Sequence, residues 1–313
     1  MSVSLVTGCA GFIGSHLTEA LLEAGEHVIG VDCFLADSYD PRVKKSNLEN
    51  FSKHKNFTFL ELDLRKDSLR LTEAIRNVSK VFHLAAMPGL PLSWEDTNLY
   101  IDCNVSATSN LISALNEAVL EHFIFISTSS VYGAEAIGNE LSKRLPVSPY
   151  GATKLSAEEL LFAHMRARKF PLTVLRFFSV YGPRQRPDMA YSKFISSLLT
   201  GKGVQMFGNG EQTRSNTYVL DAVKATIELG NSEPRGEVFN VGGREKIVLM
   251  EAMTLISEIL EKPLKIEILP KRLGDQMHTF ADTNKLLATI SDPFRTNFKE
   301  GIRRQIEWTK SNL

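Results

Sequence analysis

The sequence predicts an α/β fold, a doubly wound parallel sheet with a smaller, interleaved C-terminal lobe. Up to about residue 178 of 313, short apolar runs alternate with stretches of helical periodicity, a pattern typical of a parallel sheet covered by helices on both faces. After Tyr181, short helical stretches are separated by glycine and proline turns instead. No repeat or low-complexity linker divides the two parts, so we expect lobes that exchange segments.

Short apolar runs are expected to form the sheet, and amphipathic stretches the helices. The expected strands are Val3–Thr7, His27–Val31, Thr58–Glu61, Lys80–Leu84, His122–Ser127 and Thr173–Phe177, with Glu237–Val241 as the candidate seventh. The expected helices are Ile13–Ala24, Leu69–Asn77, Asn104–Ala118 and Tyr150–Arg168, followed in the second lobe by Met189–Leu199, Leu220–Leu229, Leu249–Leu260, Asn284–Ile290 and Phe298–Ser311. The polar segment Ala36–His54 has no clear period and is expected to be an irregular excursion.

A glycine turn directly after the first strand predicts dinucleotide binding. Val3–Thr7 leads into G-C-A-G-F-I-G and then an amphipathic helix. This order lets the backbone approach a diphosphate at the helix N-terminus, as in the Rossmann fold. Asp32 ends the second strand, where an acid accepts hydrogen bonds from an adenosine ribose and repels a 2′-phosphate, so NAD is favoured over NADP. The residues predicted to hold NAD here are Gly8, Gly11, Phe12, Ile13, Gly14 and Asp32.

The segment S-P-Y-G-A-T-K at Ser148–Lys154 predicts a general base. Proline favours the first turn of a helix, so Tyr150 and Lys154, four residues apart, share one helix face. A phenol has a pKa of about 10, and an ammonium beside it lowers that pKa toward neutrality. Thr128, closing the preceding strand, can bond to the same substrate oxygen. On its own this spacing favours an ordinary surface pair, and the surrounding motifs favour the catalytic interpretation.

Composition indicates a soluble cytoplasmic enzyme. Lys+Arg and Asp+Glu both total 36, so the net charge is zero, and we expect no binding to nucleic acid or an anionic membrane. No apolar run approaches the roughly 18 residues of a membrane span, and no leader is expected before Val3. Cys9, Cys33 and Cys103 lack metal-ligand spacing, so free thiols and no metal are expected.

Six motifs together resemble the extended short-chain dehydrogenase/reductases, in the NAD-dependent nucleotide-sugar epimerase/dehydratase group. They are G-C-A-G-F-I-G-S-H-L at Gly8–Leu17, H-L-A-A at His83–Ala86, T-S-S-V-Y-G at Thr128–Gly133, S-P-Y-G-A-T-K at Ser148–Lys154, L-R-F-F-S-V-Y-G-P-R at Leu175–Arg184 and F-N-V-G at Phe239–Gly242. The resemblance implies an NAD-binding Rossmann lobe at residues 1–178, with 220–243 added, and a nucleotide-sugar lobe mainly at 179–313. It also implies a homodimer built on Asn104–Ala118 and Tyr150–Arg168, in which the second helix presents the apolar side chains Leu155, Leu160, Leu161 and Met165.

The resemblance further implies how the cofactor and a UDP-sugar are held. Arginines suit the diphosphate because the planar guanidinium makes paired hydrogen bonds with phosphate. Residues implied near the NAD are Asp63, Leu64, Leu84, Ala85, Ala86, Tyr150 and Lys154, with His83 as a structural neighbour. Residues implied for the UDP moiety are Arg214 and Arg272 on the diphosphate, Asp275 on the ribose and Phe207 at the uracil.

The two positions after Thr128 narrow the reaction. Relatives that dehydrate the sugar carry Asp-Glu there, and decarboxylating relatives carry a glutamate before V-Y-G. This chain has Ser129 and Ser130, and neutral hydroxyls do not shuttle protons as carboxyl groups do. The expected reaction is therefore 4-epimerisation of a UDP-sugar through a 4-keto intermediate, with NAD regenerated.

The favoured substrate is UDP-glucuronic acid, converted to UDP-galacturonic acid. Ser129, Ser130 and Ser179 take places that line the C5 substituent in the family, and Arg186 lies in P-R-Q-R-P-D; hydroxyls and an arginine stabilise a carboxylate. These motifs closely resemble those of uronate 4-epimerases. Three departures are Pro91, where uronate-handling relatives tend to carry arginine, Ser179, where asparagine is common, and Ser215 and Asn216 after Arg214, where many relatives carry an acid and an aromatic residue. The alternatives are a UDP-glucose or UDP-N-acetylglucosamine 4-epimerase, a dehydratase or reductase, and a non-catalytic NAD-binding regulatory protein.

Overall fold

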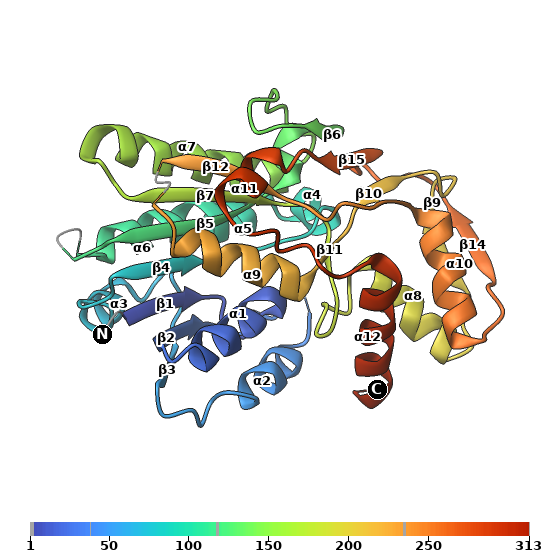
Figure 1. Ribbon diagram of the computed structural model, residues 1–313, viewed down its shortest axis with the longest axis horizontal. Coiled ribbons are helices and arrows are strands. Elements are labelled where there is room, and N and C mark those ends of the chain that lie inside the picture. Colours follow the sequence, from blue (N-terminus) through green and yellow to red (C-terminus); the bar gives the residue numbers. More distant parts are fainter. Residues whose placement is uncertain (1–2, 38, 117–118, 234–235, 313) are drawn as a thin grey trace.

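The computed structural model describes residues 3–37, 39–116, 119–233 and 236–312 and confirms the predicted α/β fold (Figure 1). Seven parallel strands form one sheet in the order β3-β2-β1-β4-β5-β7-β12. They are β1 (Val3–Thr7), β2 (His27–Asp32), β3 (Phe57–Glu61), β4 (Lys80–His83), β5 (His122–Thr128), β7 (Leu172–Phe177) and β12 (Glu237–Val241). The strand order reverses at β1, and a doubly wound sheet binds its ligands outside the carboxyl ends at such a point.

Helices cover both faces of the sheet, as its alternating side chains require (Figure 1). Along β5, Ile124 and Ile126 join the core on one face, whereas Phe123 and Phe125 join the core on the other. Successive residues of a strand point to opposite faces, so one buried strand supplies both cores. The covering helices are α1 (Phe12–Glu23) and α9 (Val219–Gly230) on one face, and α3 (Ser68–Ala74), α6 (Ala107–Ala114) and α7 (Pro149–Arg168) on the other.

The two lobes exchange segments, as expected. The chain enters the second lobe after β7 and later returns to add α9 and β12 to the large sheet. In the other direction, β6 (Glu135–Gly138) leaves the first lobe to join the four-stranded sheet β13-β10-β15-β6. The other second-lobe elements are β8 (Val180–Tyr181), α8 (Ala190–Leu199), β9 (Val204–Phe207), β10 (Thr213–Ser215), β11 (Thr217–Tyr218), β13 (Lys246–Val248), α10 (Leu249–Leu260), β14 (Ile266–Leu269), β15 (His278–Ala281), α11 (Asn284–Thr289) and α12 (Phe298–Ser311).

The helix predicted at Asn104–Ala118 has a different form. It consists of α5 (Thr97–Ile101), a π-helical turn at Asp102–Ser106 and α6, and residues 117 and 118 lie outside the described residues. In the π turn, the Asn104 side chain accepts a hydrogen bond from the Met87 N–H at 2.7 Å and donates to the Met87 carbonyl at 3.1 Å. A π turn adds a residue to one helical turn and is frequent at functional sites. Regular periodicity in the sequence does not reveal it.

The segment Ala36–His54, expected to be irregular, contains the helix α2 (Pro41–Glu49). Asp40 caps it by accepting a hydrogen bond from the backbone N–H of Arg42 at 2.9 Å, and proline occupies the first turn, as is common. The expectation was wrong because the helix buries only Asn47 and so has no apolar stripe. Asn47 donates to the Ala10 carbonyl at 3.1 Å and ties α2 to the glycine turn.

The apolar side of α7 faces the protein's own core. Leu161 is fully buried, Leu160 and Met165 pack in the same cluster, and Leu155 packs beside the chain that follows β5. Leu155, Leu160 and Met165 are only partly buried, so the expectation that this apolar side contributes to a dimer stays a prediction. Small residues make up much of the exposed side of α7, namely Ala152, Ser156, Ala163 and Ala167.

Candidate functional site

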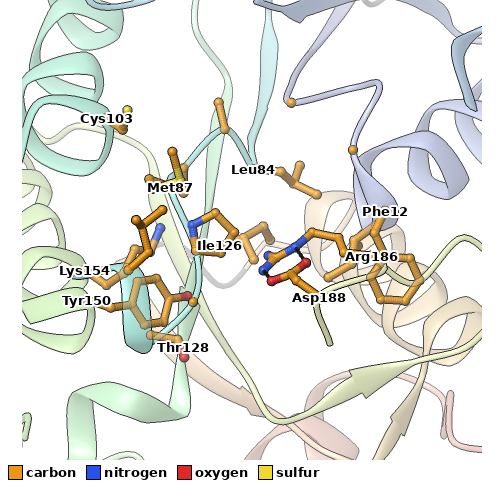
Figure 2. A pocket seen from close by; sticks show the side chains of 18 of the residues that line it. Phe12, Leu84, Met87, Cys103, Ile126, Thr128, Tyr150, Lys154, Arg186 and Asp188 are labelled. Carbon is orange, nitrogen blue, oxygen red and sulfur yellow. Dashed lines mark hydrogen bonds and ion pairs between the residues drawn. The ribbon is translucent and has the colours of Figure 1, made fainter. Parts of the chain in front are cut away.

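A cavity of about 810 Å³ opens at the carboxyl ends of the parallel strands. It brings together residues that are far apart in the sequence (Figure 2). The predicted residues that line it are Gly8, Gly11, Phe12, Ile13, Gly14, Asp32, Asp63, Leu64, Leu84, Ala85, Ala86, Thr128, Ser129, Ser130, Tyr150, Lys154, Ser179, Arg186, Arg214, Arg272 and Asp275. Phe207 lies outside this lining and packs against Arg272, whose Cζ is 4.1 Å from its ring centroid.

The glycine turn between β1 and α1 has room for an anion and no side chain that competes for it. Gly8 has φ +71°, and a Cβ built on Gly14 would lie 2.1 Å from the Gly8 carbonyl oxygen, so both positions require glycine. Gly11 is the N-cap of α1, with neither a side-chain cap nor an acidic residue in the first turn. The first N–H groups of a helix lack intrahelical partners and favour negative charge. The turn therefore fits the pyrophosphate of a dinucleotide.

Asp32 lies at the end of β2, as predicted, and is fixed by two neighbours. Its Oδ1 accepts a hydrogen bond from the Phe34 N–H at 3.0 Å and is 3.3 Å from Lys44 Nζ, which α2 carries into the cavity. At the end of β3, the Arg65 guanidinium binds both oxygens of Asp63 and holds the pKa of that carboxyl below its usual value. Two oriented carboxylates thus lie at the end of the cavity expected for adenosine.

His83 is a structural residue, as the sequence predicted. Its Nδ1 lies 2.7 Å from the Thr7 hydroxyl and its Nε2 lies 2.9 Å from the Thr108 hydroxyl. Burial lowers the pKa of His83 to about 3, so the ring stays neutral. The side chain joins β1, β4 and α6 below the cavity floor.

Tyr150, Lys154 and Thr128 meet on one side of the cavity (Figure 2). Ser148 caps α7 by accepting a backbone hydrogen bond at 3.1 Å, so Tyr150 and Lys154 lie in the first turns, as predicted. Thr128 ends β5, and its hydroxyl is hydrogen-bonded to the Tyr150 phenol. Lys154 Nζ lies 4.1 Å from the ring centroid of Phe125, a cation–π distance.

Burial dominates the protonation of this group. Lys154 is 2% exposed, and burial lowers its pKa to about 7 while the charge of Glu158 raises it. Burial likewise raises the pKa of Tyr150, and the Thr128 hydroxyl and the charge of Arg186 oppose that effect. Burial outweighs both of these effects, so the pKa of Tyr150 is raised. The expectation that Lys154 lowers the pKa of Tyr150 stays a prediction.

A buried ion pair supports the catalytic end of α7. Glu158, one turn after Lys154, accepts hydrogen bonds from Arg176 Nε at 3.0 Å and Nη2 at 2.7 Å, and from the Ser127 hydroxyl at 2.5 Å. Arg176 also donates to the Tyr132 phenol at 3.0 Å. The glutamate and arginine are 0% and 2% exposed. This network ties α7 to β5 and β7 next to the cavity.

Arg186 projects from the segment after β8 toward the side of the cavity that holds Tyr150 (Figure 2). Asp188 orients it through two hydrogen bonds, from Nε at 2.9 Å and from Nη2 at 2.6 Å. A Cβ built on Gly89 would lie 3.6 Å from Arg186 Nη2, so the guanidinium lies beside the loop that leads to Pro91, the first residue of α4 (Pro91–Glu95). The side chain is 12% exposed. This cation is largely dehydrated and held in one orientation.

The predicted serines lie on the cavity wall in three different settings. Ser129 is buried, and its hydroxyl is 3.4 Å from Gln276 Oε1. The backbone of Ser130 is fixed by its own N–H, which donates to the Thr128 hydroxyl at 3.1 Å. Ser179 has φ +24°, a left-handed backbone that side chains other than glycine rarely adopt.

The second lobe contributes two arginines at the far end of the cavity. Arg214 donates to the carbonyls of Gln276 at 2.7 Å and Met277 at 3.2 Å. Arg272 bonds Asp275 Oδ2 at 3.2 Å. Burial lowers the pKa of Arg214, and the charge of Arg272 lowers it further, so the two cations lie close enough to repel each other. An anion between them would relieve that repulsion.

Sequence reasoning missed several lining residues. Tyr39 and Lys44 lie in the segment that was expected to be irregular. The run of charged residues around α2 is the sequence feature that could have pointed to them. Gln276 directly follows Asp275, and Lys193 lies on the first turn of α8, where nothing in the pattern marks it. In the described part of the chain, no cluster of His, Cys, Asp or Glu could hold a metal, and no helix is long and apolar enough to cross a membrane.

Known proteins resemble the chain over its whole length. The model of the NAD dependent epimerase/dehydratase family matches residues 4–242. The uncharacterized UDP-glucose epimerase YtcB of Bacillus subtilis is 38% identical over 98% of each chain. The UDP-glucuronate 4-epimerase of Thermodesulfobacterium geofontis is 34% identical over 100% of this chain and 98% of its own. The structure of UDP-glucuronic acid 4-epimerase from Bacillus cereus, in complex with UDP-glucuronic acid and NAD, is similar with a TM-score of 0.93, 34% identity and full coverage of both chains.

Proposed function

The chain belongs to the NAD dependent epimerase/dehydratase family, and from this premise we propose that it epimerises UDP-glucuronic acid to UDP-galacturonic acid at C4. The observation that carries the proposal is the position of Arg186. This dehydrated, oriented guanidinium shares a cavity with the hydrogen-bonded pair Tyr150 and Thr128 and with the glycine turn. A base, an anion site and a dinucleotide site are the three parts that the reaction requires.

The cofactor site is assigned to the first lobe. Asp32 receives the adenosine ribose, the N-terminus of α1 receives the pyrophosphate, and Lys154 binds the nicotinamide ribose. NAD, when bound, supplies the hydride chemistry that makes and unmakes a 4-keto sugar. We assign residues 1–178 with 220–243 to this lobe and residues 179–313 mainly to the nucleotide sugar.

Tyr150 is the proposed base that takes the proton from the C4 hydroxyl and returns it. Its pKa is raised by burial, so the phenolate needs help to form at neutral pH. The Thr128 hydroxyl donates a hydrogen bond to it, and Arg186 and a charged Lys154 favour the anion. Lys154, with a pKa of about 7, loses or gains its own proton in the same pH range. A group that titrates in this range suits general acid–base catalysis, and here that group is Lys154.

The substrate carboxylate is assigned to Arg186 and the three serines. Oxidation at C4 makes a β-keto acid, so the enzyme has to hold the carboxylate ionised and away from alignment with the ketone. Arg186 offers a fixed cation, and Ser129, Ser130 and Ser179 offer hydroxyls. No carboxyl group stands at positions 129 and 130 to protonate a leaving hydroxyl or to promote loss of carbon dioxide. Arg186 lies beside the loop of Pro91 and supplies the cation that this loop lacks.

The UDP moiety is assigned to the second lobe. The neighbouring guanidinium groups of Arg214 and Arg272 suit a diphosphate, because each can make paired hydrogen bonds with phosphate oxygens. Asp275 is placed to accept from the uridine ribose. The ring of Phe207 packs against the Arg272 guanidinium, and it is assigned to the uracil site through this contact with the arginine.

A neutral UDP-hexose is the second candidate substrate. Two observations favour it: Pro91 removes the arginine common in uronate-handling relatives, and the similarity to YtcB points to UDP-glucose. The test is incubation of the purified protein with UDP-glucuronate, UDP-glucose and UDP-N-acetylglucosamine, with products identified by NMR. UDP-galacturonate as the sole rapid product is the expected result. Turnover of the neutral sugars with UDP-glucuronate untouched would overturn the proposal, and a UDP-pentose product would overturn the carboxylate argument.

We further propose that the chain works as a cytoplasmic homodimer. The exposed, small side chains of α7 allow close approach of a second helix, and the partly buried Leu155, Leu160 and Met165 add apolar surface to the same helix. The free thiols of Cys9, Cys33 and Cys103 suit a reducing compartment. Light scattering at micromolar concentration is expected to give twice the chain mass, and Ala163→Glu is expected to give a monomer. A monomeric wild-type protein would contradict this assignment.

A further inference from the structure

The ring of Tyr39 lies within reach of two cations that come from different segments of the cavity lining. Lys44 Nζ is 5.6 Å from the ring centroid, and Arg186 Cζ is 5.8 Å from it. Both distances fall within the roughly 6 Å over which a cation is attracted to an aromatic ring. Lys44 pairs with Asp32 at 3.3 Å, and Arg186 pairs with Asp188 at 2.6 Å. Tyr39 itself lines the cavity.

Both cations are sheltered from water, so these contacts are stronger than surface contacts. The side chains of Lys44 and Arg186 are 14% and 12% exposed, and cation–π attraction grows as a cation loses its hydration. Burial raises the pKa of the Tyr39 phenol, so the ring stays neutral throughout the working pH range. Tyr39 directly precedes α2, and α2 is held in place because Asp40 caps it and Asn47 binds it to the glycine turn.

We propose that Tyr39 is a positioning residue that joins the cofactor end of the cavity to its substrate end. The ring holds Lys44 beside the ribose-binding carboxylate of Asp32 and Arg186 beside the sugar. When a cofactor engages Asp32 and Lys44, the ring and thus Arg186 are held more firmly, and binding of the sugar carboxylate becomes stronger. By linkage, the sugar strengthens cofactor binding by the same factor. This inference rests on the proposed function, since it assigns the carboxylate to Arg186.

The test uses the Tyr150→Phe background, in which substrate binds without turnover. Calorimetry gives the Kd of UDP-glucuronate and of UDP-glucose for the NAD-loaded protein, and the Kd of NAD for protein stripped of cofactor. Tyr39→Leu is expected to weaken UDP-glucuronate binding about 2- to 30-fold, the range of one cation–π contact, with UDP-glucose changed less than about twofold. Tyr39→Phe keeps the ring and is expected to match the parent within about twofold.

A double-mutant cycle separates this role from general loosening of the loop. Lys44→Met removes the cofactor-end cation, and it is expected to weaken UDP-glucuronate binding when Tyr39 is present and to have no such effect with Tyr39→Leu. If Lys44→Met has the same effect with Tyr39 and with Tyr39→Leu, or if it has no effect when Tyr39 is present, the proposal is overturned. The absence of an effect in the presence of Tyr39 can be measured even if Tyr39→Leu does not fold. If UDP-glucuronate and UDP-glucose bind equally in every variant, the uronate assignment fails. The Lys44→Met effect on UDP-sugar binding still tests Tyr39 in that case.

Discussion

Replacing Glu158 with glutamine is expected to weaken both the fold and the catalytic end of α7. The carboxylate is fully buried and accepts two hydrogen bonds from Arg176, at 3.0 and 2.7 Å, and one from Ser127. Removing one partner of such a pair leaves a buried guanidinium without a counter-charge, which costs about 3 to 5 kcal/mol. In a chain of this size each kcal/mol lowers Tm by roughly 2 °C. Tm is therefore expected to fall by roughly 6 to 10 °C.

The same change is expected to alter the protonation of Lys154. The charge of Glu158 raises the pKa of Lys154, which burial has lowered to about 7. Without that charge the pKa of Lys154 falls further, so the ammonium is lost at lower pH. The pH profile of kcat/KM is expected to show that loss as a shift of its Lys154-dependent limb toward acid.

The neighbouring glutamate provides a matched control. Glu159 also pairs with an arginine, Arg144, but its side chain is 45% exposed. An exposed pair contributes about 1 kcal/mol or less, so Glu159→Gln is expected to change Tm by no more than about 2 °C and to leave the pH profile unchanged. Thermal and urea unfolding of the two variants would decide the question. Equal Tm values for Glu158→Gln and the wild type would refute the reasoning about the buried pair.

Four further results are expected. The wild-type protein should bind NAD far better than NADP. Asp32→Ala should reduce this difference in affinity, because Lys44 can then contact the 2′-phosphate without the repelling carboxylate of Asp32. Equal affinities of the wild-type protein for the two cofactors would contradict this. Tyr150→Phe should retain NAD and UDP-sugar binding and lose turnover by orders of magnitude, so a wild-type rate would exclude Tyr150 as the base. Lys154→Ala should weaken NAD binding and move the activity profile to higher pH. For wild-type Lys154, the unfolded chain binds more protons between pH about 7 and about 10.4. The free energy of unfolding should therefore rise with pH across this window, and Lys154→Met should remove that rise.

The large sheet could be predicted from sequence because each of its strands is visible as a local pattern of residues. Each strand is an apolar run bounded by a turn, and all seven expected runs form strands of the sheet. Carboxyl ends of parallel strands meet at one edge, so the glycine turn, Asp32 and Thr128 could be placed together before the structure was known. Proline and helical spacing placed Tyr150 and Lys154 on one helix face, and the surrounding motifs favoured their catalytic interpretation.

The small sheets of the second lobe could not be predicted in the same way. Their strands are two to four residues long, and some lie in neighbourhoods without alternation, as in β10 (Thr213–Ser215) and β13 (Lys246–Val248). They are held by pairing between segments far apart in sequence, such as β6 with β15. Tyr39 and Lys44 were missed for a related reason. A helix that covers little apolar surface leaves no period to detect.

Ser179 joins the fold to the proposed chemistry through its backbone. Its φ is +24°, and it lies where the chain leaves β7. The backbone is fixed on both sides of this point, because the Phe178 N–H donates to the Val241 carbonyl and the Ser179 carbonyl accepts from the Thr217 N–H. Asparagine tolerates left-handed backbone better than serine does. A serine here carries more strain, and strain of this kind persists at functional sites where the surroundings enforce it. Ser179 and Arg186 both line the cavity, and in the proposed function the serine hydroxyl helps the arginine to hold the charged substituent at C5.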